Sequence, residues 1–213
     1  MVRKRFDDLD EQRREGIFDA AAAEFEARGY DGASINRIIE QAGISKGTLY
    51  YYFDDKEDLF STVVEYAMTR LTEGIGIPSL DHLDKTTFWN AYRSVMLRSV
   101  EFLQRNARYV RLARSFFKVR AETPGSQVAR RVAEMGRSQL HKILSRGQDL
   151  GVVRTDLPLP LLVEVALAVD EAGDRWRLEH WNDFTSDERI RIADAHIDLI
   201  RDMLHAKNQG WEE

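Results

Sequence analysis

The chain of 213 residues contains no cysteine, only four prolines and no long apolar run. Without cysteine there are no disulfides, no thiolate zinc sites and no cysteine nucleophiles. No segment has the roughly 20 consecutive apolar residues that a membrane-spanning helix needs, and the charged amino terminus has no apolar signal core. We therefore expect a cytoplasmic protein that makes no contact with a membrane.

An excess of positive charge is also missing. The 31 Lys and Arg residues stand against 36 Asp and Glu, and the net charge of −5 argues against a protein that coats nucleic acid through bulk charge. The five histidines are scattered, with no HExxH pair, and no segment resembles a phosphate-binding glycine loop or a GxSxG nucleophile turn. The sequence thus predicts no catalytic residues, no metal site and no cofactor.

Nearly every segment has instead the 3.6-residue apolar period of α-helices, so we predict an all-α fold. Glycine, proline and capping residues divide the chain into helices, with the loosest joint at Gly74, Gly76 and Pro78. The predicted helices span about 10–28, 34–42, 46–53, 55–72, 86–105, 107–120, 126–150, 159–181 and 186–206.

Two very short predicted helices follow the first one. Ser34 and Ser45 can each cap the start of one of them, and Gly43 can end the first. The connection at Gly43 and Ile44 is as tight as the turn of a helix-turn-helix. This pair of helices is therefore the candidate for a nucleic-acid-binding element.

The second short helix has two different faces. Leu49 and Phe53 are i,i+4 neighbours on one side, whereas Tyr50 and Tyr51 point away from that side. The first side is suited to a core. Tyr50 and Tyr51 are therefore expected to contact a group outside this core.

Residues 33–60, ASINRIIEQAGISKGTLYYYFDDKEDLF, closely resemble the DNA-binding region of TetR/AcrR-family transcriptional regulators. The resemblance covers about the first sixty residues in order. It implies a helix-turn-helix DNA-binding domain at 1–60 and a larger helical domain at 61–213 with a small-molecule cavity. It also implies a homodimer built from the last two long helices.

Positions that match the family's motif identify the expected contacts with double-stranded operator DNA. A tyrosine ring can lie against sugar and thymine methyl groups while its hydroxyl bonds a phosphate oxygen. A glycine lets the backbone approach the bases closely. The resemblance implies phosphate contacts from Ser34, Tyr50, Tyr51 and Lys56, and groove or base proximity for Lys46, Gly47 and Thr48.

The charge of this region is a difficulty for DNA binding. Residues 1–60 contain nine Lys or Arg and fourteen Asp or Glu, yet a DNA-binding surface must neutralise phosphates. Local cations such as Arg37 can supply the charge, together with Arg13, Arg14, Lys46 and Lys56. The arm Arg3-Lys4-Arg5 can reach a minor groove, or it can be a solvated tail.

A small-molecule effector would bind in the second domain. Its aromatic and apolar side chains either line a pocket or only pack the core, and helical spacing alone allows both. Glu171 and Asp174 follow an apolar run and can face the cavity to bind a cationic or hydroxylated ligand, or form salt bridges across a dimer axis. The candidate ligand-binding residues are Trp89, Tyr92, Met96, Phe116, Phe117, Glu171, Asp174 and Trp176.

Basic residues also recur every three or four positions over 105–118. This stripe is expected to be a solvated helix face, and the alternative is a surface that contacts DNA or an acidic ligand. Apolar seams over 165–173 and 190–204 are suited to a four-helix dimer interface or to burial within one chain.

The sequence favours a homodimeric, ligand-responsive regulator, a repressor that binds a palindromic operator and is released by a small molecule. The alternatives are a helical interaction module whose helix-turn-helix no longer binds DNA, and an all-helical enzyme.

Overall fold

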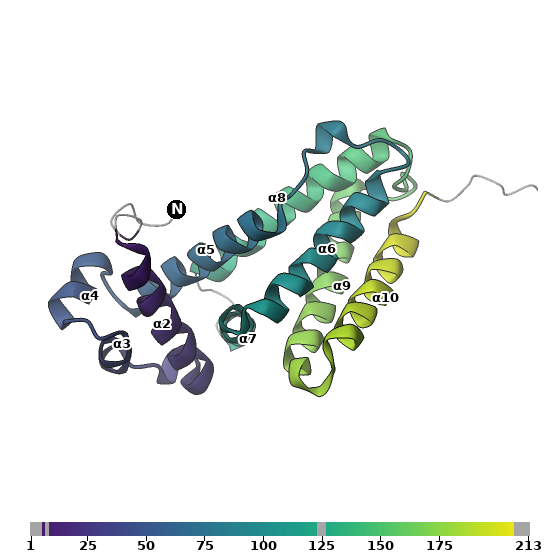
Figure 1. Ribbon diagram of the computed structural model, residues 1–213. Helices are drawn as coiled ribbons and strands as arrows, with labels where there is room; N and C mark the ends of the chain where they lie inside the picture. Colours follow the sequence, from purple (N-terminus) through teal and green to yellow (C-terminus); the bar gives the residue numbers. More distant parts are fainter. Residues whose placement is uncertain (1–5, 7–8, 123–126, 207–213) are drawn as a thin grey trace, which may run out of the picture. The chain divides into compact units, whose positions relative to one another are not determined.

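The computed structural model describes Phe6 and residues 9–122 and 127–206, and within these ranges the chain is helical (Figure 1). Most helix boundaries lie within a few residues of the predicted ones, so the all-α prediction is confirmed. One isolated bridge joins Val153 to His205. The elements are α2 (Glu11–Gly32), α3 (Ile35–Ala42), α4 (Lys46–Tyr52), α5 (Lys56–Ile75), η1 (Leu80–His82), α6 (Phe88–Arg105), α7 (Ala107–Glu122), α8 (Gln127–Asp149), α9 (Leu159–Glu179), η2 (Trp181–Asp183) and α10 (Ser186–Leu204).

The chain forms two compact units, each made of two segments. The first contains 1–74 and 105–131, and the second contains 75–104 and 132–213. The first unit therefore includes α7 as well as the helix-turn-helix. The predicted boundary at residue 60, which divides the chain once, stays a prediction.

The core of the first unit is built around α2. Ile17, Phe18 and Phe25 are completely buried on one face of this helix, as the apolar period predicts. The helix predicted to end near residue 28 has a kink at Gly29, whose left-handed φ of 66° favours glycine, and it continues to Gly32.

Helix α7 packs against the acidic side of α2. Arg108 pairs with Glu15, and Arg111 and Arg114 lie 3.7 and 3.3 Å from the carboxylate oxygens of Glu26. The prediction of a solvated basic face is therefore wrong for these three arginines. The pattern within α7 could not reveal the correct arrangement, because the partners lie some ninety residues earlier in the chain.

In the second unit α6, α8, α9 and α10 enclose a core that includes Phe88, Leu144, Leu162 and Leu204. Helices α9 and α10 form an antiparallel hairpin (Figure 1), and a capping box between Thr185 and Glu188 starts the second of them. No helix in the described ranges is long and apolar enough to cross a membrane.

Candidate nucleic-acid interface

Helices α3 and α4 form the helix-turn-helix. Gly43 ends α3 in the left-handed conformation, with a φ of 63°, and its backbone N–H donates to Glu40. Ser45 begins α4, because its hydroxyl accepts a hydrogen bond of 3.0 Å from the Thr48 N–H. The two capping signals in the sequence thus fix the turn and the start of α4.

The two faces of α4 are as different as its sequence predicts. Leu49 is 1% exposed and the following Phe53 is fully buried, whereas Tyr50 is 46% and Tyr51 is 59% exposed. Tyr52 is half-buried, with its ring edge-on to that of Tyr51 at 5.0 Å between centroids. Two tyrosines are therefore presented outward on a helix that is anchored from the other side.

Cationic and small residues surround these tyrosines. The Lys46 ammonium lies 5.8 Å from the centre of the Tyr50 ring, and Gly47 is exposed beside it. An added Cβ at Gly47 would meet only the Ser45 hydroxyl, at 3.8 Å, so the protein's own packing does not require glycine there. The Thr48 hydroxyl lies 2.8 Å from that of Ser45 and shares the cap.

Lys56 is the first residue of α5 and is half-buried. Its ammonium donates to the Asp31 carbonyl at 3.0 Å and lies 4.8 Å from the centre of the Tyr30 ring. An ammonium group has three N–H donors, so one bond to a carbonyl leaves two others for a phosphate. The Asp55 carboxylate accepts from the Asp58 N–H at 2.8 Å and caps α5.

Ser34, which precedes α3, and Arg37 on α3 are both bonded to α2. The Arg37 guanidinium binds the carboxylate of Glu24, and the Ser34 backbone N–H donates to the same carboxylate. Sequence reasoning did not single out Glu24. Its position one turn from Ala20 and Ala21, on the apolar face of α2, was the signal that could have found it.

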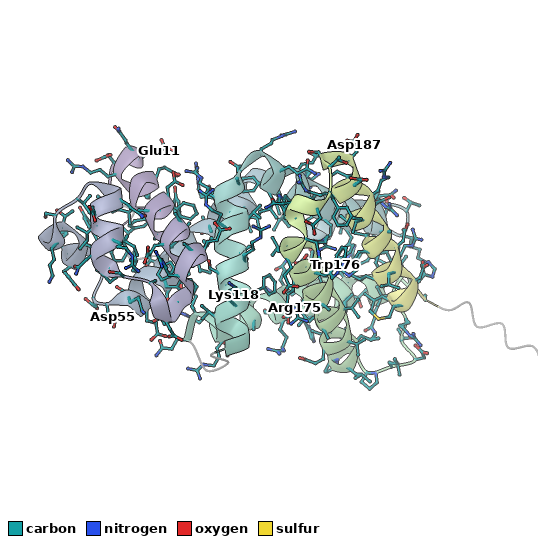
Figure 2. All side chains as sticks on the ribbon, turned by 90° about the horizontal axis from the view of Figure 1, so that it is seen from below. Glu11, Asp55, Lys118, Arg175, Trp176 and Asp187 are labelled. Carbon is teal, nitrogen blue, oxygen red and sulfur yellow. The ribbon has the colours of Figure 1, made fainter. Side chains whose placement is uncertain are left out.

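The acidic excess of the first sixty residues is offset within the first unit. Residues 105–131 contain eight Lys or Arg and only one acidic residue, whereas residues 1–60 contain nine Lys or Arg and fourteen Asp or Glu. Lys118 is exposed on this segment (Figure 2). The arm Arg3-Lys4-Arg5 lies outside the described residues.

The candidate ligand-binding residues fall into both units. Trp89, Tyr92 and Met96 lie on α6, and Glu171, Asp174 and Trp176 lie on α9, all in the second unit. Trp176, which is labelled in Figure 2, has a side chain that is 44% exposed. The hollow beside it holds only about 10 Å³. Phe116 and Phe117 lie on α7, in the first unit.

A cluster of charged side chains joins α9 to α10. Asp174 binds Arg177, and the guanidinium of Arg177 donates to His196 Nδ1 at 2.5 Å. His196 Nε2 then carries the ring proton and donates to the Val169 carbonyl at 3.3 Å. The ring lies so close to Gly173 that a Cβ there would be 2.3 Å from it. Glycine at this position thus permits the close approach of the two helices.

The proton equilibria of this cluster are displaced. Burial, with a further contribution from Asp174, raises the pKa of Asp170 to about 7. Burial and the Arg177 charge lower the pKa of His196, while burial and Asp170 raise that of the Tyr92 hydroxyl. Asp170, Arg177 and His196 were not among the predicted site residues. No group of three potential metal ligands was found in the part of the chain that the structure describes.

Comparison with known proteins places residues 17–63 in the family described as "Bacterial regulatory proteins, tetR family". The HTH-type transcriptional repressor AcnR of Corynebacterium diphtheriae is 36% identical over 61 residues, which are 29% of this chain and 32% of that protein. AcnR of Corynebacterium efficiens is 26% identical over 149 residues, which are 70% and 73% of the two chains. The chain spans about a third of the length of the first two curated relatives that it matches.

The similarity of fold extends over both units. The structure of SmeT, the repressor of the Stenotrophomonas maltophilia multidrug efflux pump SmeDEF, matches with a TM-score of 0.71 at 20% identity over 94% of each chain. Sequence similarity is therefore concentrated in the helix-turn-helix, and the second unit shares a fold with proteins of different sequence.

Proposed function

We propose that this chain is a TetR-family regulator, a cytoplasmic, homodimeric repressor that binds a palindromic operator and responds to a small molecule, because residues 17–63 match the family of bacterial tetR regulatory proteins. The observation that carries the proposal is that α4 has one exposed face and one buried face. Tyr50 and Tyr51 are exposed, whereas Leu49 and the following Phe53 are buried. Such a helix is anchored on one side and is able to enter a major groove with the other.

The predicted contacts are compatible with distinct roles in that complex. Tyr50 and Tyr51 on the exposed side of α4, and Lys56 at the start of α5, have groups that can bond phosphate oxygens. Lys46, Gly47 and Thr48 form its first turn, where side chains of a recognition helix meet base edges. Phosphate contacts provide most of the affinity and its salt dependence, and the first turn provides the sequence preference.

The homodimer is supported by an apolar groove in the second unit. The groove has a volume of about 490 Å³ between α9 and α10, and its lining includes Val165 and Leu199, which are 39% and 60% exposed. A two-fold contact between two such hairpins would bury these side chains in a four-helix interface. A dimer places its two helix-turn-helix units on half-sites about 34 to 36 Å apart, or a multiple of that spacing.

The response to an effector rests on α6 and α9. Trp89 and Tyr92 on α6 are only partly buried against the core of the second unit, so part of their surface remains for a ligand. Glu171 on α9 provides negative charge that a cationic or hydroxylated compound can use, whereas Asp174 takes part only if the compound displaces Arg177. Such a compound releases the operator only if it binds the DNA-free conformation more tightly than the DNA-bound one.

The test is a selection of bound sequences from a random double-stranded DNA pool by the purified full chain at a stated salt concentration. We expect a palindrome with two half-sites. Enrichment of a single half-site would contradict the dimer, and no enrichment would favour an interaction module that does not bind DNA.

The selected operator then serves to screen compounds for release. Release at a compound concentration that leaves the protein folded supports the effector response. A screen in which only denaturing compounds release the operator contradicts it.

A further inference from the structure

A carboxylate is buried beneath the helix-turn-helix, at a position that the predicted DNA contacts do not include. The side chain of Glu24 is only 4% exposed, and its neighbours on α2 include Ala21 and Phe25, which are completely buried. An ionised carboxylate is costly to bury unless charged or hydrogen-bonding partners replace the lost water. Glu24 therefore requires specific partners.

One oxygen of this carboxylate receives three hydrogen bonds from α3 and its start. Glu24 Oε1 accepts from Arg37 Nε at 2.8 Å, from Arg37 Nη2 at 2.6 Å and from the Ser34 backbone N–H at 2.9 Å. Arg37 Nη2 also donates to the Gly32 carbonyl at 3.0 Å. A single acidic group thus fixes the end of α2, the connection that follows and the first turn of α3.

The same contacts determine what Ser34 can do. A serine at a helix start commonly uses its hydroxyl to accept a backbone N–H of the first turn, as Ser45 does in α4. Ser34 makes no such bond. Its backbone is held by Glu24, so its hydroxyl is not committed to the helix end and can face a phosphate.

Arg37 is exposed but differs from a free surface cation in its hydrogen bonds within the protein. Both its Nε and Nη2 groups are bonded inside the protein, and the hydrogen bond to Glu24 raises the pKa of Arg37 while it lowers that of Glu24. The Arg37 side chain is 44% exposed, so it lies at the surface of the unit while Nε and Nη2 are bonded within the protein.

We propose that Glu24 is a positioning residue for DNA recognition, which sets the pose of α3 and hence of α4, and that Arg37 acts through Glu24 rather than as a phosphate contact. This inference rests on the proposed function. The link to α4 is short, since only Gly43 to Ser45 separate the two helices, and both ends of that turn are capped.

The sign of the charge effect gives a sharp test. Glu24→Gln and Glu40→Gln each remove one negative charge from the helix-turn-helix region, and Glu40 is exposed on α3. Simple electrostatics predicts that both changes tighten binding to the operator, because each reduces repulsion of phosphates. Positioning by Glu24 predicts that Glu24→Gln weakens binding, by on the order of tenfold, while Glu40→Gln does not. Equal or tighter binding by Glu24→Gln would overturn the inference.

Arg37 provides the second measurement, the slope of operator affinity against salt concentration. Arg37→Lys keeps the positive charge but cannot reproduce the two-pronged bond to Glu24. We expect weaker binding with an unchanged salt slope, and no further loss when Arg37→Lys is combined with Glu24→Gln. Arg37→Gln should likewise leave the slope unchanged. A slope reduced by about one in Arg37→Gln, with wild-type affinity in Arg37→Lys, would identify a phosphate contact instead.

All measurements are made well below the thermal unfolding midpoint of each variant, which is determined in parallel. If the wild-type chain binds no operator, the proposed function fails. If it binds and Glu24→Gln binds equally well, only this inference fails. Should Glu24→Gln not fold, the Arg37→Lys result decides alone.

Discussion

The Lys56 ammonium is held between the Asp31 carbonyl and the face of the Tyr30 ring. These contacts restrict a side chain that otherwise loses much rotamer freedom when it binds a ligand. Lys56→Ala should weaken operator binding across all sequences and reduce the salt slope by about one, because one phosphate contact is lost. Affinities measured over a range of salt concentrations check this prediction.

The matched control is Lys142→Ala, which removes an exposed lysine from α8 in the second unit. It changes the net charge equally and should leave the slope as in the wild type. An equal reduction of the slope in both variants would show that Lys56 acts through net charge and makes no specific contact.

Single residues of the interface were predictable to different degrees. The burial of Leu49 and the exposure of Tyr50 and Tyr51 follow from the period of one helix, and the capping by Ser45 follows from local chemistry. The environment of Arg37 could not be predicted, because its partner lies on another helix, thirteen residues earlier. Periodicity locates a side chain on a face but does not identify what that face meets.

At the scale of helices the same limit applies to charge patterns. The arginines of α7 have the spacing of a solvated face, yet Arg108, Arg111 and Arg114 pair with acidic residues of α2. Charged residues on α9 likewise have a partner on another helix, because Asp174 binds Arg177 and Arg177 donates to His196 of α10. Asp170, one turn before Asp174 on the same helix, has a pKa raised to about 7 by burial and by the Asp174 charge.

The displaced pKa makes the stability of the second unit dependent on pH. In the unfolded chain Asp170 releases its proton near pH 4, whereas in the folded chain it does so near pH 7. The folded state therefore binds more protons between these values, and the stabilising contribution of the protonated group is lost as pH rises through 7. At pH 8 the ionised carboxylate destabilises the fold.

Asp170→Asn should raise the thermal unfolding midpoint at pH 8, with a gain that disappears toward pH 4. Each kcal/mol corresponds to about 2 to 4 °C in a chain of this size. Unfolding followed by circular dichroism across this pH range is the measurement. Glu179→Gln, on the exposed side of the same helix, is the control and should show no pH-dependent gain. A lower midpoint for Asp170→Asn at pH 8 would contradict the prediction.

At the scale of the whole molecule, the groove between α9 and α10 determines the expected assembly. Leu199→Asp places a charge where the proposed two-fold contact buries an apolar side chain. We expect light scattering to give the 24.6 kDa of one chain for this variant and about twice that mass for the wild type. Operator affinity should fall together with the mass, because only one half-site is then engaged at a time.

Ile77→Asp is the control for this change, since Ile77 is 46% exposed outside the groove. It should keep the mass of the dimer. A Leu199→Asp variant that also keeps that mass would show that the subunits meet elsewhere.

The two-segment composition of the first unit limits how this protein can be recombined with others. A chimera that joins residues 1–60 to a foreign effector domain would separate α2 from α7 and leave Glu15 and Glu26 without Arg108, Arg111 and Arg114. The transplanted piece would also be net acidic by five charges. A transferable DNA-binding unit must therefore include residues 105–131. An exchange of the second unit that keeps the first intact requires three junctions in the chain.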